Sequence, residues 1–161
     1  MRLKLPSTPK SNVLSRRSAL SAASFGMAAL ATAPARVEAA EWTATEKANV
    51  QLIKEFCASV ATHDMVKIMS FFSEKGSYRL TETQEPAKGR EAVMEKINGY
   101  LPRVVRFEIL ETFAKGPMVI NERIDSFMGG PLRSWHGTGV FFIKEGLIVE
   151  WYDYTISVDR G

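Results

Sequence analysis

Residues 121–125 read Asn-Glu-Arg-Ile-Asp and lie within a run that has the composition of a β-strand. Because successive side chains of a strand point to opposite faces, Asn121, Arg123 and Asp125 would share one face of a sheet. A second charged strand motif, Trp-Tyr-Asp-Tyr, follows at residues 151–154. Charged groups on a half-buried sheet face are costly unless they pair with one another, and they are often functional. We therefore expect a polar site on one face of the sheet.

Four β-rich runs follow Pro102, and short segments containing Gly separate them. Successive strands with tight connections pair mainly as an antiparallel sheet. Gly137 and Gly139 interrupt the third run, where they would suit a bend or a bulge. The predicted strands are residues 104–114, 118–127, 133–144 and 147–158.

Three helices and one short strand are predicted before Pro102. The first helix has apolar residues at three- and four-residue spacing, and Asp64 is positioned to cap the second. Because the sheet has one face to cover, and these helices are the available cover, we expect an α+β domain. The helices would be packed in a strongly curved, mostly antiparallel sheet, with a pocket between them. The predicted helices are residues 45–62, 64–75 and 89–100, and the predicted strand is residues 77–81.

Residues 1–39 have the features of a cleaved export signal. A basic leader ends at Arg16 and Arg17, a charge-free run rich in Ala and Ser follows, and small or medium-sized residues occupy 37–39. The adjacent arginines resemble a twin-arginine signal; a mitochondrial transit peptide and a short membrane anchor are the alternatives. Cleavage would leave a single domain, residues 40–161, in the periplasm or secreted, without stable membrane insertion.

The net charge of the predicted mature domain excludes an electrostatic argument for nucleic-acid binding. Residues 1–39 contain six basic residues and one acidic residue of the 21 and 18 in the chain. The domain therefore keeps 15 basic and 17 acidic residues, and its net charge is −2 rather than the +3 of the whole chain. Cys57 is the only cysteine, which excludes an intramolecular disulfide, and the sequence has no metal-ligand spacing and no Gly-rich phosphate loop. We expect no cofactor.

Four motifs follow one another along the chain: Gly-Arg-Glu-Ala-Val at 89–93, Glu-Arg-Ile-Asp at 122–125, Gly-Val-Phe at 139–141 and Trp-Tyr-Asp-Tyr at 151–154. In this order they resemble the limonene-1,2-epoxide hydrolase family. That family belongs to the superfamily of nuclear transport factor 2, ketosteroid isomerase and SnoaL-like proteins, so the resemblance implies their cone-shaped roll. Folds of this kind often dimerise through the outer face of the sheet, so the resemblance also implies a homodimer.

The resemblance implies a cofactor-free hydrolase that opens an epoxide on a small hydrophobic substrate. Asp153 would act as the general base on water, Asp125 as the general acid on the epoxide oxygen, and Arg123 would bridge the two carboxylates. Two carboxylates at one apolar pocket cannot both ionise cheaply, so their pKa values are expected to separate.

The family also holds its attacking water with a Tyr-x-Asn pair on the first strand. Tyr78 matches the tyrosine, but Leu80 stands at the position of the asparagine, or Thr81 if the register shifts by one residue. Leucine cannot hydrogen-bond water. The resemblance places six further side chains at the pocket: Leu80, Thr81, Tyr100, Phe127, Trp135 and Trp151.

Two other functions are compatible with the sequence. An isomerase or cyclase of the same fold could use one carboxylate as a base and would not need the missing asparagine. A non-catalytic domain could use the same charges to orient a small apolar ligand.

Overall fold

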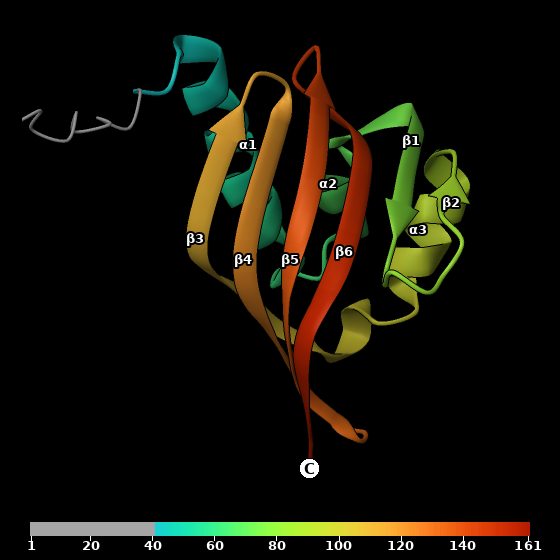
Figure 1. The fold of residues 1–161 in the computed structure, drawn as a ribbon. Helices are drawn as coiled ribbons and strands as arrows, with labels where there is room; N and C mark the ends of the chain where they lie inside the picture. The colour runs from blue at the N-terminus through green and yellow to red at the C-terminus, as the bar shows by residue number, and fades with distance from the viewer. Residues whose placement is uncertain (1–40) are drawn as a thin grey trace, which may run out of the picture. The chain divides into compact units, whose positions relative to one another are not determined.

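Helices make up most of the first part of the described chain, and four long strands make up the rest (Figure 1). The computed structural model describes residues 41–161, so the predicted export signal at residues 1–39 lies outside the described residues and stays a prediction. Among the described residues, no helix is long and apolar enough to span a membrane. The elements are α1 Ala44–Val60, α2 Met65–Met69, β1 Phe72–Arg79, β2 Ala87–Lys88, α3 Arg90–Asn98, the 3-10 helix η1 Leu101–Arg103, β3 Val104–Lys115, β4 Met118–Phe127, β5 Leu132–Lys144 and β6 Leu147–Arg160.

The sheet has six strands in the order β2-β1-β6-β5-β4-β3. Strands β3 to β6 form an antiparallel meander, whereas β1 joins β6 in parallel and β2 pairs antiparallel with β1. Helix α1 packs against β3 and β4, and α3 packs against β1, so the helices cover one face of the curved sheet (Figure 1). The predicted α+β class, with helices on a curved and mostly antiparallel sheet, is confirmed.

The N-terminus of α1 is attached to the β3–β4 turn through Glu46. Thr43 and Glu46 form a capping box, in which the Glu46 N–H donates to Thr43 Oγ1 at 3.2 Å and the Thr43 N–H donates to Glu46 Oε2 at 2.8 Å. The second carboxylate oxygen, Oε1, accepts the Gly116 N–H at 2.7 Å. This contact fixes one end of the helix against the sheet.

The second helix is shorter than predicted. We expected it to extend over residues 64–75, but α2 ends at Met69 and the strand β1 has already begun at Phe72. The Phe71 carbonyl accepts the Ile148 N–H at 2.7 Å, and Phe72 pairs with Ile148 of β6. Pairing with a distant strand therefore overrides the local helical spacing of the apolar residues. The loop predicted before residue 89 also contains the short strand β2.

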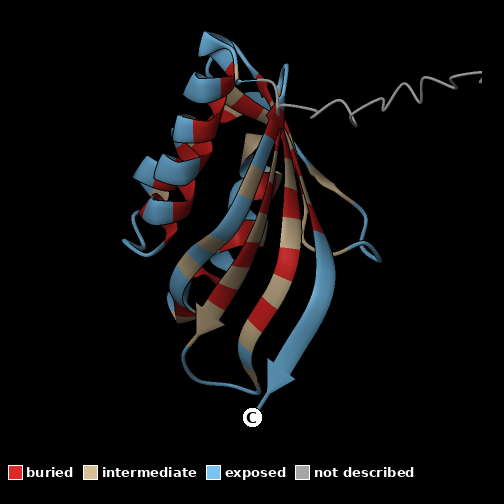
Figure 2. Cartoon of the chain, turned by 60° about the vertical axis from the view of Figure 1, so that its left-hand side comes forward, coloured by how far each residue is buried: buried red, intermediate tan, exposed pale blue. Residues whose placement is uncertain are grey.

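An aromatic cluster connects α1 with the sheet. The ring of Phe56 makes edge contacts with those of Phe72, Phe141 and Trp151, at centroid distances of 5.4, 6.0 and 5.1 Å. Trp151 in turn stacks on Tyr78 with a centroid distance of 3.9 Å. Burial alternates along β4 and β5 (Figure 2), because every second side chain of these strands lies on the face that the helices cover. The last ring of the cluster, Tyr78, lies at the cavity described below.

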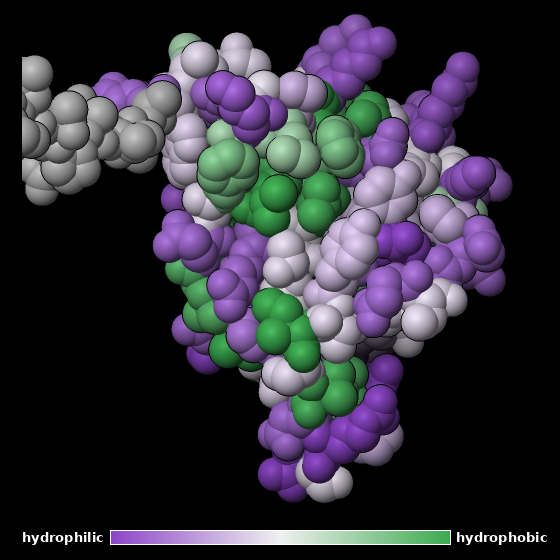
Figure 3. Space-filling model, in the orientation of Figure 1, coloured by the Kyte–Doolittle hydropathy of each residue, from purple (hydrophilic) through white to green (hydrophobic). Residues whose placement is uncertain are grey.

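The opposite face of the sheet carries apolar side chains in separate groups among polar ones (Figure 3). Two large exposed ones are Phe113 of β3 and Tyr154 of β6, which are adjacent in sequence to Ala114 and Asp153 on the buried face. Association of two copies through this face stays a prediction.

Candidate active site

A fully buried arginine, Arg123, is the centre of the candidate site. As the strand periodicity predicted, Asn121, Arg123 and Asp125 lie together on the buried face of β4. The guanidinium donates through Nη1 to Asn121 Oδ1 at 3.1 Å and through Nε to Asp125 Oδ1 at 3.0 Å. Its Nη2 donates to Oδ1 of Asp153, on β6, at 2.9 Å. All three guanidinium nitrogens are therefore hydrogen-bonded within the protein.

Aromatic rings surround the Arg123 guanidinium. The rings of Phe107, Trp135 and Trp151 have their centroids 5.0, 5.3 and 5.4 Å from its central carbon. Cations are attracted to the faces of aromatic rings, and this attraction strengthens when water is excluded. The rings therefore offset part of the cost of burying the charge.

Two glycines of β5 leave room for the cation and for Trp135. A Cβ added at Gly139 would lie 2.2 Å from Arg123 Nη1, and one added at Gly137 would lie 2.0 Å from the Trp135 ring. The pairing of β5 with β6 also shifts register between His136 and Gly137, so the predicted irregularity in this strand is present. The additional reason for glycine, which is the space it leaves on the buried face, could not be inferred from the sequence.

Asp153 receives three hydrogen bonds, which orient its carboxylate. Its Oδ1 accepts from Arg123 and also from Trp151 Nε1 at 2.7 Å. Its Oδ2 lies 3.4 Å from the hydroxyl of Tyr78, which is positioned to donate to it. Because Oδ1 already has two donors, Oδ2 is the oxygen left for chemistry.

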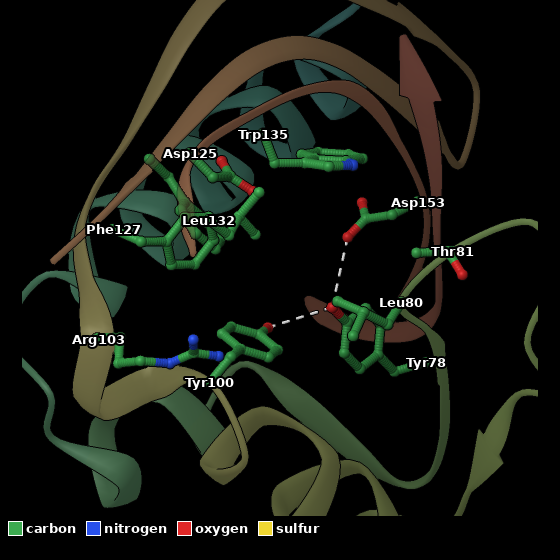
Figure 4. A pocket seen from close by; sticks show the side chains of 11 residues that line it. Tyr78, Leu80, Thr81, Tyr100, Arg103, Asp125, Phe127, Leu132, Trp135 and Asp153 are labelled. Carbon is green, nitrogen blue, oxygen red and sulfur yellow. Dashed lines mark hydrogen bonds between the residues drawn. The ribbon is translucent and has the colours of Figure 1, made fainter. Parts of the chain in front are cut away.

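A pair of tyrosine hydroxyls lies beside Asp153 (Figure 4). The hydroxyl oxygens of Tyr78 and Tyr100 are 3.2 Å apart. Tyr78 has a single hydroxyl proton, so when it donates to Asp153 its oxygen can accept the proton of Tyr100. Burial raises the pKa of Tyr78 well above its ordinary value, and Tyr100 and Asp153 add to this shift. Burial also raises the pKa of Tyr100. Both hydroxyls therefore remain protonated donors.

The two carboxylates differ in how well their charged forms are stabilised. Burial raises the pKa of Asp125 to about 7, and the negative charge of Asp153 adds to the shift, although Arg123 opposes it. Burial also raises the pKa of Asp153, against hydrogen bonds from Arg123, Trp151 and Tyr78. Asp125 accepts only one such bond, from Arg123. A proton shared by the pair therefore resides preferentially on Asp125.

Arg123 stays positively charged. Burial lowers its pKa, but the nearby carboxylates of Asp125 and Asp153 outweigh this effect, and the pKa lies well above its ordinary value. The cluster thus consists of a fixed cation, Asp153, whose charged form is stabilised by three hydrogen bonds, and Asp125, whose pKa is raised to about 7. In such an arrangement, Asp153 can accept a proton and Asp125 can donate one at a neighbouring position.

Both carboxylates face a cavity with a volume of about 150 Å³. A cavity of roughly this volume can hold one aromatic ring. Two of the predicted residues, Arg123 and Trp151, are fully buried and do not line the cavity. Trp151 lies in the core, from which its indole N–H donates to Asp153. The lining residues that were predicted are Tyr78, Leu80, Thr81, Tyr100, Asp125, Phe127, Trp135 and Asp153.

Three further lining residues were not predicted: Arg103, Phe107 and Leu132. Phe107 lies directly opposite Asp125 in the β3–β4 pairing, so the alternation of β3 could have identified it once the register was known. Arg103 and Leu132 lie at element ends, where no periodic pattern signals their direction. Within residues 41–161, no cluster of His, Cys, Asp or Glu side chains is arranged to hold a metal ion.

The position expected to hold water is apolar. Leu80 lines the cavity. Thr81 also reaches it, but its hydroxyl lies 3.2 Å from that of Thr83, and Figure 4 shows it directed away from Asp153. On this side, the polar group within hydrogen-bond distance of Asp153 Oδ2 is therefore the Tyr78 hydroxyl.

Comparison with known proteins identifies the family. Residues 53–151 match the model of the SnoaL-like domain, and the chain belongs to this family. No curated protein matches the sequence significantly.

Solved structures share the fold at low sequence identity. An LEH-like epoxide hydrolase from M. tuberculosis is 22% identical with a TM-score of 0.61, over 69% of this chain and 84% of that one. The epoxide hydrolase/cyclase-like enzyme SalBIII, with a role in pyran ring formation in the polyether salinomycin, is 20% identical with a TM-score of 0.64, over 68% and 92%. An NTF2-like protein from Cytophaga hutchinsonii is 14% identical with a TM-score of 0.57, over 73% and 94%. The fold class and the place in the SnoaL-like superfamily expected from the sequence are thus confirmed.

Replacing Gly139 with alanine should disrupt the Arg123 cluster. The new Cβ would meet Arg123 Nη1, which its hydrogen bonds hold in place, and the ring of Phe141 at 2.8 Å. We expect the free energy of unfolding to fall by about 1–3 kcal/mol, as for other overpacked sites, measured by urea denaturation. The control is Gly99→Ala at the end of α3, where φ is −62° and the nearest contact is 3.4 Å. An equal and small effect of both substitutions would contradict this account of Gly139.

Proposed function

We propose that this protein is a cofactor-independent enzyme that opens an epoxide on a small hydrophobic molecule, with Asp153 as general base and Asp125 as general acid. The observation that carries the proposal is the pair of carboxylates at one apolar cavity, bridged by Arg123 and differing in their tendency to hold a proton. The fold shared with an LEH-like epoxide hydrolase and with SalBIII supports the same class of chemistry.

The oxygen that Arg123 does not bind suits the proposed role of each carboxylate. Asp153 Oδ2 is the oxygen not bound by Arg123 or Trp151, and it is available to accept a proton. Asp125 Oδ1 is bound by Arg123. Asp125 Oδ2 makes no hydrogen bond with the described residues. It is not fully buried, and it is therefore accessible from the cavity that Asp125 lines. Oδ2 is therefore the position from which Asp125 would donate its proton.

The proposed reaction transfers two protons and exchanges one C–O bond for another. A hydroxyl nucleophile loses its proton to Asp153 as its oxygen forms a bond to an epoxide carbon. The bond from that carbon to the epoxide oxygen breaks, and the oxygen takes the proton of Asp125. Afterwards Asp153 is protonated and Asp125 is ionised, and proton exchange with solvent restores the starting state. Arg123 remains between the two and limits the change in electrostatic energy.

The identity of the nucleophile distinguishes hydrolysis from a second candidate, cyclisation. If water attacks, the product is a diol. If a hydroxyl of the substrate attacks, the product is a cyclic ether. Leu80 favours the second candidate, because the substrate itself can position its hydroxyl, whereas a leucine cannot hold water. The role of SalBIII in pyran ring formation is consistent with such a reaction on this fold.

Asp153→Asn and Asp125→Asn should each reduce epoxide turnover by at least about 100-fold, because each removes a proton-transfer group. Turnover is measured over a panel of aryl and alkyl epoxides, with and without an internal hydroxyl, by quantifying diol and cyclic ether. Asp159→Asn, an exposed carboxylate on the same strand as Asp153, serves as the control. Wild-type turnover in Asp153→Asn, or no turnover by the unmodified enzyme on any member of the panel, would refute the proposed reaction.

The dependence on pH should follow the protonation of Asp125. Its pKa of about 7 predicts that kcat/KM falls as the pH rises through this value, because the general acid is lost. At low pH the activity should also fall as Asp153 becomes protonated, which gives a bell-shaped profile.

The same titration should appear in folding stability without any substrate. Since burial raises the pKa of Asp125 above its unfolded value of 3.8, its protonation favours the folded state at low pH. This contribution is complete below about pH 4 and is lost as the pH rises through about 7. The difference in free energy of unfolding between wild type and Asp125→Asn should therefore change between these limits. A constant difference would contradict the shifted pKa.

Leu80→Asn should increase the proportion of diol formed from an epoxide that carries an internal hydroxyl. The amide would supply a hydrogen-bonding group for water beside Tyr78 and Asp153. The products are quantified by chromatography, and Leu80→Ala controls for the enlarged cavity without adding a polar group. An equal product ratio in all three proteins would argue against Leu80 as the determinant of the nucleophile.

A further inference from the structure

A second arginine, Arg103, lines the cavity and takes no part in the carboxylate cluster. No Asp or Glu among residues 41–161 lies within ion-pair distance of it. The cavity surface is otherwise mostly apolar, apart from the two carboxylates and a few hydroxyls. A half-buried guanidinium without a carboxylate partner is unusual at such a surface, since arginine side chains in this setting normally pair.

The backbone fixes Arg103 at the junction of three segments. Its N–H donates to the Tyr100 carbonyl at 3.0 Å within the 3-10 helix, and its carbonyl accepts the Met128 N–H from the β4–β5 loop at 2.8 Å. Gly130 of that loop leaves space for the side chain, because a Cβ there would lie 3.1 Å from Arg103 Nη1. Figure 4 shows the side chain entering from the side of the cavity opposite Asp153 and Thr81. The backbone that carries this side chain is thus held in place on both sides of the residue before any ligand binds.

Arg103 forms no ion pair with either of the reacting carboxylates, although it lines the same cavity. The charges that shift the pKa of Asp125 are those of Arg123 and Asp153, and Arg103 is not among them. When Asp153 is ionised and Asp125 is protonated, Arg123 and Asp153 balance each other. The charge of Arg103 then remains uncompensated at the cavity.

We infer that Arg103 binds a carboxylate of the substrate, which would be an amphipathic molecule with an apolar body and one anionic end. The inference rests on the proposed function in so far as the bound molecule is the epoxide that reacts. A guanidinium offers two parallel N–H groups that match the two oxygens of a carboxylate. A single carboxylate also matches the single charge of Arg103. A phosphate monoester carries about −1.5 to −2 at neutral pH and would be repelled by Asp153 in the same cavity.

Binding of unreactive ligands tests this inference independently of catalysis. The probes are phenylbutanoate, phenylbutanol, phenylbutylammonium and phenylbutyl phosphate, which share one apolar body and differ in the end group. Dissociation constants are measured with the purified protein by calorimetry or by the quenching of tryptophan fluorescence. We expect the carboxylate to bind about 10- to 100-fold more tightly than the alcohol, as for other charged hydrogen bonds. The phosphate and the ammonium should bind more weakly than the carboxylate.

Variants assign this preference to Arg103. Arg103→Gln should remove the advantage of the carboxylate over the alcohol, and Arg103→Lys should retain part of it. Arg106→Gln is the matched control, because it removes the same charge at an exposed position outside the cavity. Arg106 precedes Phe107 in β3, and since Phe107 faces the cavity, the side chain of Arg106 lies on the other face of the strand. Thermal melts verify that each variant is folded. Equal binding of carboxylate and alcohol, no binding of the carboxylate at millimolar concentration, or a preference that survives Arg103→Gln would overturn the inference. Tighter binding of the phosphate would replace the carboxylate with a phosphorylated substrate and would also overturn it.

A pair of epoxides, a carboxylate and its methyl ester, separates this inference from the proposed function. If both react through Asp153 with the same KM, epoxide opening stands and recognition by Arg103 is wrong. If the unreactive carboxylate binds through Arg103 but neither epoxide reacts, recognition stands and epoxide opening is wrong. If both hold, the carboxylate epoxide should have a KM at least about 10-fold lower than the ester, and Arg103→Gln should abolish the difference.

Discussion

The burial of the Arg123 guanidinium is the constraint on which the site depends. A buried cation must have its nitrogens paired, and here three partners from two strands supply the acceptors. Their positions are therefore coupled, since moving Asn121, Asp125 or Asp153 would leave a donor unpaired. Apolar residues of similar volume would often be as stable in such a place. The cost of keeping an ion cluster in the core is thus more readily explained by chemistry than by stability.

The sequence predicted that the β4 residues of this cluster share one face, but it did not show how Asp153 of β6 comes to lie beside them. The alternation of β4 places Asn121, Arg123 and Asp125 on one face, which periodicity alone could predict. Asp153 reaches the same point because β6 pairs with β5, and β5 with β4, in a register that depends on long-range packing. The family resemblance anticipated this meeting, whereas spacing along the chain could not. The sequence also could not indicate Arg103, whose direction depends on the loop that packs against it.

Local periodicity was misleading where a distant strand competed for the same residues. The apolar residues after Asp64 have helical spacing, yet Phe71 and Phe72 are bound to β6. This parallel pairing places Tyr78 next to Trp151 in the sheet, so that one ring stacks on the other while its hydroxyl reaches Asp153. The aromatic core and the candidate site therefore share residues, and substitutions in the core are expected to alter both.

The fixed orientation of the two carboxylates has a consequence for the handedness of any product. In each, one oxygen is bound to Arg123 and the other is presented to the cavity. In the proposed reaction, the nucleophile would lose its proton at one defined point and the epoxide oxygen would gain one at another. A chiral epoxide anchored at its far end would then expose only one of its two ring carbons, from one direction. Such a site would discriminate between mirror-image substrates and form a single stereoisomer.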